Sequence, residues 1–280
     1  MQITPIGTQR DLLDEHLLDD FSKQLLDDAV RILGDSNYNT RLHIFAVLVR
    51  EAITHTLHTL APTEEVEASP WYKKADGTAG PTREQRLRYA MQGGMTDALV
   101  DSLPTDIADE RDELLKTFKA LNKYTHLRPG NLITNQTDMN DFAVNTLIAL
   151  LDFLRAAKTF REALSNYVES AVGDALTSHT FEAHLDELAE ISGGYEVDSI
   201  WPDELKVESI GPTEIILAVS AEIHVTLHYG GRSDATSLAD SYPFTAKVAA
   251  SVENLSDVQV REFRIDNSSF FGPDAEREPG

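Results

Sequence analysis

The sequence predicts an α+β protein in which an N-terminal helical bundle is followed by a small antiparallel β-sheet or sandwich. Two changes along the chain carry this prediction. In roughly the first two-thirds, apolar residues recur every three or four positions, as on the buried face of an amphipathic helix. After Tyr195 the apolar spacing becomes two, which is typical of strands with one buried face. We therefore expect a helical domain at 1–194, a β domain at 195–272 and a flexible tail at 273–280.

About five to six helices are expected in the bundle, each delimited by a cap or a breaker. The first two run from Thr8 to Gly34 and from Tyr38 to Leu60. The third begins at the capping-box pair Thr82 and Gln85 and ends near Ser102, and the fourth runs from Thr105 or Asp106 to His126 or Leu127. The fifth runs from Asp138 through Val172, and a short last helix contains Leu185 and Ile191. Gly93-Gly94 could bend the third helix, and Gly173 could interrupt the fifth. The acidic, proline-containing and glycine-containing segment 63–81 should form a loop, with Trp71 and Tyr72 packed back onto the bundle.

The β domain should contain four or five antiparallel strands. Candidates lie at 204–210, 215–229, 244–252 and 258–265. Within the second of these, Ile223, Val225 and Leu227 alternate with polar residues, so one face should be buried and the other wet.

The net charge of the chain limits the classes of function that it can have. The chain has 24 Lys plus Arg against 47 Asp plus Glu, a net charge of −23 at pH 7. This excludes a generally basic protein that coats nucleic acid, but permits one local cationic site. The sequence has no Cys, which excludes thiolate nucleophiles and Cys-based metal sites and fits a reducing compartment. We find no secretory h-region or apolar stretch of membrane-spanning length, and expect a cytoplasmic protein with no membrane association.

The fourth predicted helix carries the most suggestive cluster of cations. Lys116, Lys119 and Lys123 share one stripe with His126, while Asn122 borders the stripe and Arg128 follows the helix end. Such a stripe could hold a phosphate or an RNA backbone. The alternative is a solvated basic face near a helix C-terminus.

A second group of cations opens the third predicted helix. Arg83, Arg86 and Arg88 precede Tyr89 and could bind an anion near the helix N-terminus. The alternative is that these arginines form salt bridges with the abundant acids.

Two histidine patterns are weaker. Glu51, His55 and His58 occupy adjacent turns of one helix face, a spacing that could ligate a metal, but no further ligand cluster completes the shell. His224 and His228 share a strand face but stand about 13 Å apart, too far to bind one metal together. We expect no metal and no other cofactor. Walker, dinucleotide-binding, nucleophile-elbow and zinc-protease motifs are missing from the sequence.

The segment Phe118-Lys-Ala-Leu-Asn-Lys-Tyr-Thr-His126, with the helix-rich region before it, resembles the HEPN superfamily. The segment Pro81-Thr-Arg-Glu-Gln-Arg-Leu-Arg-Tyr89, with Leu121–His126 and Ser241-Tyr-Pro-Phe244, also resembles the predicted pPIWI-associating nuclease families of prokaryotic conflict systems. The HEPN resemblance implies a four- or five-helix bundle with an Arg-x4-6-His motif. It further implies metal-independent ribonuclease activity, often in a dimer that brings two motifs together.

Carried over from this resemblance, His126 is the acid-base or phosphate-contacting residue, with Lys119, Asn122 and Lys123 beside it. Lys119 stands where the family has Arg, so the bidentate grip on phosphate is lost, and Asn122 does not directly follow it. Arg50 and His55 also have Arg-x4-His spacing, but five residues along a helix turn the side chains about 140° apart.

The leading hypothesis is an antiphage or conflict-system protein that cleaves or binds RNA through the stripe on the fourth helix, with Lys116, Arg128, Arg83, Arg86 and Arg88 as substrate contacts. The alternative is a non-catalytic accessory or sensor subunit that docks an effector protein from the same operon. A homodimer is possible under both hypotheses, and a metal-dependent enzyme at Glu51, His55 and His58 is a third, weaker option.

Overall fold

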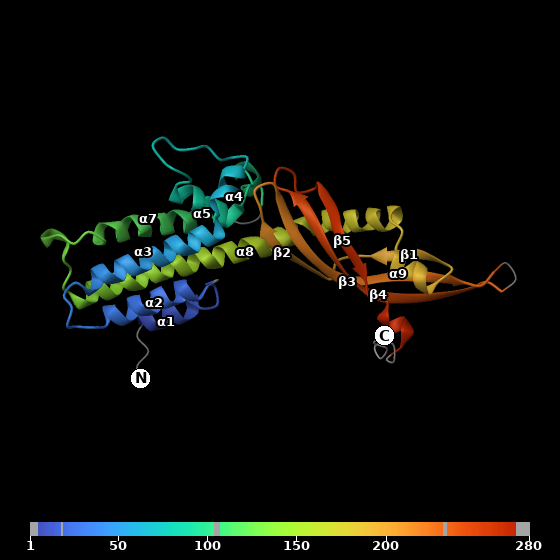
Figure 1. The fold of residues 1–280 in the computed structure, drawn as a ribbon, viewed down its shortest axis with the longest axis horizontal. Coiled ribbons are helices and arrows are strands. Elements are labelled where there is room, and N and C mark those ends of the chain that lie inside the picture. The colour runs from blue at the N-terminus through green and yellow to red at the C-terminus, as the bar shows by residue number, and fades with distance from the viewer. Residues whose placement is uncertain (1–4, 18, 104–106, 232–233, 273–280) are drawn as a thin grey trace, which may run out of the picture. The chain divides into compact units, whose positions relative to one another are not determined.

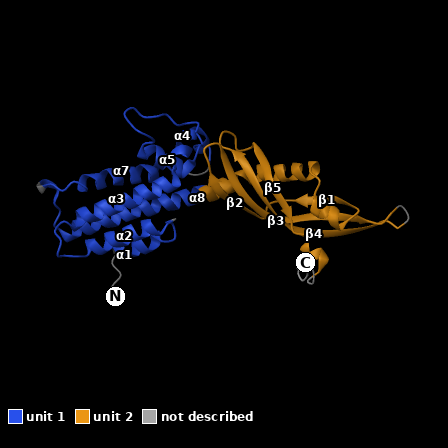
Figure 2. Cartoon of the chain, in the orientation of Figure 1, with its two compact units in different colours: residues 1–160 blue, residues 161–280 orange. Residues whose placement is uncertain are grey.

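The structure, a computed structural model, describes residues 5–17, 19–103, 107–231 and 234–272. The chain divides into two compact units, residues 1–160 and 161–280 (Figure 2). The boundary between the units lies inside helix α8 (Gln136–Glu182). Residues 161–194 belong to the same compact unit as the strands.

The first unit is helical, and the described residues of the whole chain form nine α-helices. Those of the first unit are α1 (Pro5–Leu13), α2 (Asp20–Leu33), α3 (Arg41–Leu60), α4 (Thr63–Ala68), α5 (Arg83–Gln92), α6 (Asp97–Val100), α7 (Ala108–Tyr124) and the first part of α8 (Figure 1). There are more helices than predicted because breaks divide two of the expected ones and α4 forms within the expected loop.

The predicted first helix is wrong as one continuous element. Asp19 caps α2, and its Oδ1 accepts a hydrogen bond from the Ser22 N–H at 2.8 Å. The side chain of Arg10 on α1 is 6% exposed; it pairs with Asp14 at 2.6 Å and donates to the Lys23 carbonyl on α2 at 3.0 Å. The apolar period runs through this break, so periodicity alone did not show that the chain turns back there.

The third predicted helix also ends early. The Thr82–Gln85 capping box is confirmed, with the Gln85 N–H donating to Thr82 Oγ1 and the Thr82 N–H to Gln85 Oε1. Gly93 then adopts φ 57°, a left-handed conformation that ends α5 before α6 begins. The indole of Trp71 donates to the Gly93 carbonyl at 2.8 Å, so the predicted packing of Trp71 onto the bundle is confirmed.

The ends of α7 and the start of α8 are set by two asparagines. The Asn131 amide donates to the carbonyls of Lys123 and His126, both at 2.8 Å, just past the end of α7 at Tyr124. Asn135 Oδ1 accepts from the backbone N–H groups at 137 and 138, so the predicted cap at Asp138 is wrong by three residues. The predicted start of the fourth helix, at 105 or 106, lies outside the described residues.

The second unit contains α9 (Asp186–Ile191) and an antiparallel five-stranded sheet of β1 (Gly194–Ile200), β2 (Glu204–Ile210), β3 (Glu214–Tyr229), β4 (Thr236–Ser251) and β5 (Val258–Ile265). The strand order is β1-β3-β4-β5, and β2 pairs with the other half of β3. The prediction of four or five antiparallel strands is confirmed. Strand β1 was missed because, of its residues, only Ile200 is buried. The tail at 273–280 lies outside the described residues.

The apolar face of the sheet packs against the C-terminal part of α8. Alternate residues of β3, among them Leu217 and Val219, are buried. The Val207 N–H donates to Ser165 Oγ on α8 at 3.2 Å, and the His179 ring on α8 lies 5.4 Å from the Phe263 ring on β5. The opposite face of the sheet carries the polar residues of the alternation.

Gly173 does not interrupt α8, contrary to the prediction. The helix continues through it to Glu182, and the Trp201 ring packs on the site where a side chain would stand. A Cβ at Gly173 would lie 2.7 Å from Trp201 Cζ3. Gly173 is therefore required for the close approach of the Trp201 ring.

This close approach predicts opposite effects of Gly173→Ala in two backgrounds. In the wild-type chain the new methyl group clashes with Trp201, and the free energy of unfolding should fall. In a Trp201→Ala background the same change should raise it by about 1 kcal/mol, the ordinary advantage of Ala over Gly within a helix. Denaturant unfolding followed by circular dichroism on the four proteins measures both values. The same sign in both backgrounds would contradict the assignment.

Candidate functional site

Helices α3, α5 and α7 pack against one another and line an open pocket of about 620 Å³, which we call the three-helix pocket. Its lining comprises Thr54, Leu57 and His58 from α3; Thr78, Gly80, Pro81, Thr82, Arg83, Glu84 and Arg86 from α5 and the segment before it; and Leu115, Phe118, Lys119 and Asn122 from α7. The pocket therefore joins segments from three separate parts of the sequence.

The charge of the pocket is opposite to that of the chain. Arg83, Arg86 and Lys119 line it against a single carboxylate, Glu84, whereas the whole chain has a net charge of −23. The N-terminus of α5 also lines the pocket, and the helix dipole adds partial positive charge there. This arrangement favours an anionic ligand.

Arg83 is held by an aromatic ring. Its guanidinium lies 4.0 Å from the centroid of the Phe118 ring on α7, a cation–π contact. Burial lowers the pKa of Arg83, and the nearby charge of Arg50 lowers it further, while Glu51 opposes the change. A guanidinium can hold a phosphate through two hydrogen bonds at once, so Arg83 is suited to bind a phosphate in this pocket.

Arg86 is the structural cation of the pocket. It is 7% exposed, and its guanidinium donates to the Ala61 carbonyl and, at 2.8 Å, to Thr63 Oγ1. Burial is the largest influence on its pKa and lowers it, against the opposing charges of Glu64 and Glu67. Arg86 thereby fixes α5 to the chain just after α3 and adds positive charge to the wall of the pocket.

His58 is the histidine of the pocket lining. Burial lowers the pKa of His58 from its ordinary value of 6.5, and the charges of Arg86 and His55 lower it further. The imidazole is therefore neutral at pH 7 and able to accept a proton.

Arg88 lies outside the pocket lining. Its guanidinium pairs with Asp97 at 2.9 Å and stacks over the Trp71 ring at 4.2 Å, and burial lowers its pKa. The salt-bridging alternative considered for the arginine group thus describes Arg88, whereas Arg83 and Arg86 line the pocket.

The basic stripe of α7 is only partly directed to the pocket. The lining residues Leu115, Phe118 and Asn122 define the pocket-facing side of the helix, and Lys119 lies at its margin. Lys116 pairs with Glu113 at 3.3 Å, and Lys123 Nζ lies 5.7 Å from the centroid of the Tyr124 ring. The structure therefore joins Lys119 and Asn122 to Arg83 and Arg86, and leaves Lys116 and Lys123 outside.

His126 and Arg128 follow the end of α7 and do not belong to the pocket lining. Both side chains are exposed, and the Arg128 backbone N–H donates to Asn131 Oδ1 at 2.8 Å. Within one described chain, His126 thus lies apart from the group formed by Lys119, Arg83 and Arg86.

The other histidine patterns have separate partners. Glu51 pairs with Arg50, and His55 Nε2 lies 3.3 Å from Asp19 Oδ1. Among the described residues, no group of three or more His, Asp or Glu could hold a metal ion, so the structure does not assemble a site from Glu51, His55 and His58. On the sheet, His228 Nδ1 contacts Ser237 Oγ at 3.0 Å.

Sequence reasoning considered His58 only for a metal site, and it did not predict that Thr54 and His58 line a pocket or that the Phe118 ring contacts Arg83. One local signal was present, because Thr54 and His58 are one helical turn apart and share a face of α3. Nothing in the local sequence indicates that this face lies opposite Arg83 and Lys119.

Comparison with known families covers nearly all of the chain. Residues 14–150 match one family model and residues 157–271 match a second, and both are described as predicted pPIWI-associating nuclease. The chain is similar to these predicted nucleases in both halves. The predicted resemblance to these families is confirmed, while the HEPN resemblance stays a prediction. Neither the curated proteins nor the solved structures give a match. Within the described residues, no helix is both long and apolar enough to cross a membrane.

The lowered pKa of His58 predicts a dependence of stability on pH. In the unfolded chain His58 has its ordinary pKa of 6.5, so as the pH falls the unfolded state binds this proton before the folded state does. The contribution of His58 to the free energy of unfolding is therefore constant above about pH 6.5 and declines below it. His58→Gln should make the decline less steep, as measured by denaturant unfolding between pH 7.5 and about 5. An NMR titration in which the His58 ring titrates at or above 6.5 would contradict this prediction.

Proposed function

We propose that the three-helix pocket binds the phosphodiester backbone of RNA and cleaves it, as a ribonuclease of a prokaryotic conflict system. One observation carries the proposal: three cations and a histidine with a lowered pKa share one pocket in a chain of net charge −23. The match to predicted nuclease families supports the class of activity.

Different residues of the pocket carry out different steps of the proposed reaction. His58 accepts the proton of the ribose 2′-hydroxyl, and the 2′-oxygen attacks the phosphorus. Arg83 and Lys119 stabilise the negative charge that develops on the phosphoryl oxygens. The bond to the 5′-oxygen breaks, and Lys119 donates a proton to this leaving oxygen. The products are a 2′,3′-cyclic phosphate and a 5′-hydroxyl, so the substrate must carry a 2′-hydroxyl and DNA is excluded.

The sequence motif supports a different base. In that form of the proposal, His126 exchanges the proton, with Lys123 and Arg128 beside it and Lys116 as a substrate contact. Because His126 lies outside the pocket lining of a single chain, this form depends on a second chain or on an extended RNA path. The two forms assign the essential proton transfer to different histidines and are separable by substitution.

The central test is cleavage of a fluorescent single-stranded RNA by the purified full-length chain with and without EDTA. We expect cleavage in both conditions, and His58→Ala should slow it by about 10²-fold or more. Arg83→Ala and Lys119→Ala should also slow it, because each removes a charge that stabilises the transition state. Lys116→Ala and Arg88→Lys are matched controls, since both cations lie outside the pocket lining and should leave the rate nearly unchanged. An RNA with 2′-deoxyribose at the cleaved position should resist cleavage.

Two results would overturn this assignment. Unchanged cleavage by His58→Ala combined with loss of cleavage in His126→Ala would transfer the activity to the motif at the end of α7. Lack of cleavage of any RNA by the wild-type chain would contradict the catalytic proposal itself.

A second proposed function is that of an accessory or sensor subunit that docks a pPIWI protein. The specific observation in its favour is that both matching families are described as pPIWI-associating. The net charge of −23 is compatible with shielding a basic, nucleic-acid-binding surface of such a partner. Stoichiometric co-purification with the pPIWI protein of the same operon, with no intrinsic RNA cleavage, would favour this function over the first.

A further inference from the structure

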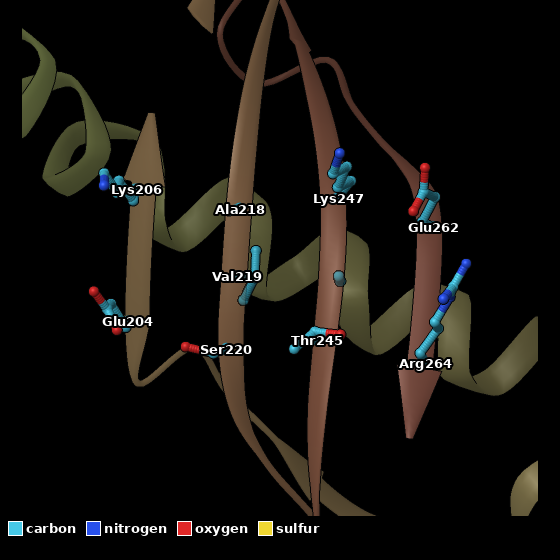
Figure 3. A pocket seen from close by; sticks show the side chains of 10 residues that line it. Glu204, Lys206, Ala218, Val219, Ser220, Thr245, Lys247, Glu262 and Arg264 are labelled. Atoms are coloured by element: carbon cyan, nitrogen blue, oxygen red, sulfur yellow. The ribbon is translucent and has the colours of Figure 1, made fainter. Parts of the chain in front are cut away.

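The polar face of the sheet carries an ordered pattern of charge. The strand register aligns Lys206 on β2, Ala218 on β3, Lys247 on β4 and Glu262 on β5 in one row across four strands. The next row contains Glu204, Ser220, Thr245 and Arg264 in the same strand order. Both rows line one shallow pocket of about 370 Å³ on the face away from α8 (Figure 3).

The two rows have opposite charges at their ends. Lys206 and Glu204 lie on β2 at one side of the pocket, and Glu262 and Arg264 lie on β5 at the other side (Figure 3). In the part of the chain that the structure describes, these four end residues form no ion pair, whereas Lys247 pairs with Glu208 at 3.9 Å. The strands β2 and β5 are separated by three strand spacings, about 14 Å, so the end charges of one row do not meet within one chain.

From this pattern we infer that the polar face of the sheet binds the same face of a second copy of the chain. A twofold axis parallel to the strands, midway between β3 and β4, places β2 of one copy over β5 of the other and keeps each row opposite itself. Lys206 then faces Glu262 of the second copy, and Glu204 faces Arg264 of the second copy. The symmetry doubles these contacts to four ion pairs.

The side-chain sizes fit the same axis. Strand β4 of one copy lies over β3 of the other, so the long Lys247 side chain stands over Ala218 of the second copy. In the next row Thr245 stands over Ser220 of the second copy, within reach of a hydroxyl–hydroxyl hydrogen bond. Long side chains thus oppose small ones, as close packing of two sheet faces requires.

The charge pattern favours a second copy over other occupants. A nucleic acid would place phosphates against the carboxylates of Glu204 and Glu262. A uniformly acidic protein would place its own carboxylates against them. Two chains of charge −23 repel each other over most of their surfaces, but here three cations offset two carboxylates in the lining. The inference goes beyond the proposed function, because it concerns the second unit and does not require RNA cleavage.

The test is the oligomeric state of the full-length chain, measured by sedimentation velocity over a range of concentrations at low salt. We expect a reversible dimer that weakens as salt screens the ion pairs. Lys206→Glu and Glu262→Lys, each alone, should raise the dissociation constant of the dimer at least tenfold, because each places like charges opposite each other. Both residues are exposed, and circular dichroism checks that the variants fold. Lys74→Glu, an exposed charge reversal in the helical unit, is the matched control and should leave the dimer intact.

An equimolar mixture of the two single variants gives the decisive result. In a mixed dimer the substituted position 206 of one copy faces the substituted position 262 of the other, and the unaltered Glu262 faces the unaltered Lys206. The mixture should therefore form a dimer that neither variant forms alone. A wild-type chain that stays monomeric at all concentrations would overturn the inference. Single variants that dimerise as the wild type does, or a mixture that stays monomeric, would overturn it as well.

Discussion

The buried hydrogen bonds of Arg86 are the constraint on which the three-helix pocket depends. Through Ala61 and Thr63, this one guanidinium attaches α5 to the segment that follows α3. The attachment brings the first turn of α5 to the C-terminal half of α3, and α7 closes the pocket through the contact of Phe118 with Arg83. The same buried charge contributes to the lowered pKa of His58. A single side chain thus couples the packing of the helices to the chemistry of the pocket.

The negative net charge of the chain makes a pocket lined by cations the favoured place for an anion to bind. An acidic chain repels polyanions over most of its surface, so an RNA that binds must do so where cations are concentrated. Several of the scarce cations are committed to other partners, as Arg10 is to Asp14 and Arg88 is to Asp97. Three others, Arg83, Arg86 and Lys119, share the lining of the three-helix pocket with His58. On this account the acidity supports selectivity for a small, defined RNA site and opposes general coating of nucleic acid.

Local signals in the sequence were sufficient for much of the fold. The capping box at Thr82 and Gln85 and the alternation along β3 depend on near neighbours, and both were predicted correctly. The break before Asp19 was missed because the apolar period continues across it, and the close approach of the Trp201 ring to Gly173 joins residues that are distant in the sequence. The candidate site was predicted in part, since Arg83, Arg86, Lys119 and Asn122 were selected by type and spacing. The place of His58 in the pocket lining was not predicted, because only tertiary packing brings α3 opposite α5 and α7.

The most direct measurement of the central claim is an NMR titration of the histidine ring signals with uridine 3′-monophosphate, which offers a phosphate and a 2′-hydroxyl without a bond to cleave. We expect the His58 signals to shift as the nucleotide binds. The pKa of His58 should also rise, because the bound phosphate favours the protonated ring. The same titration on Arg83→Ala should require a higher nucleotide concentration. Signals of His58 that stay fixed at saturating nucleotide, or shifts confined to His126, would contradict the claim that the three-helix pocket is the site.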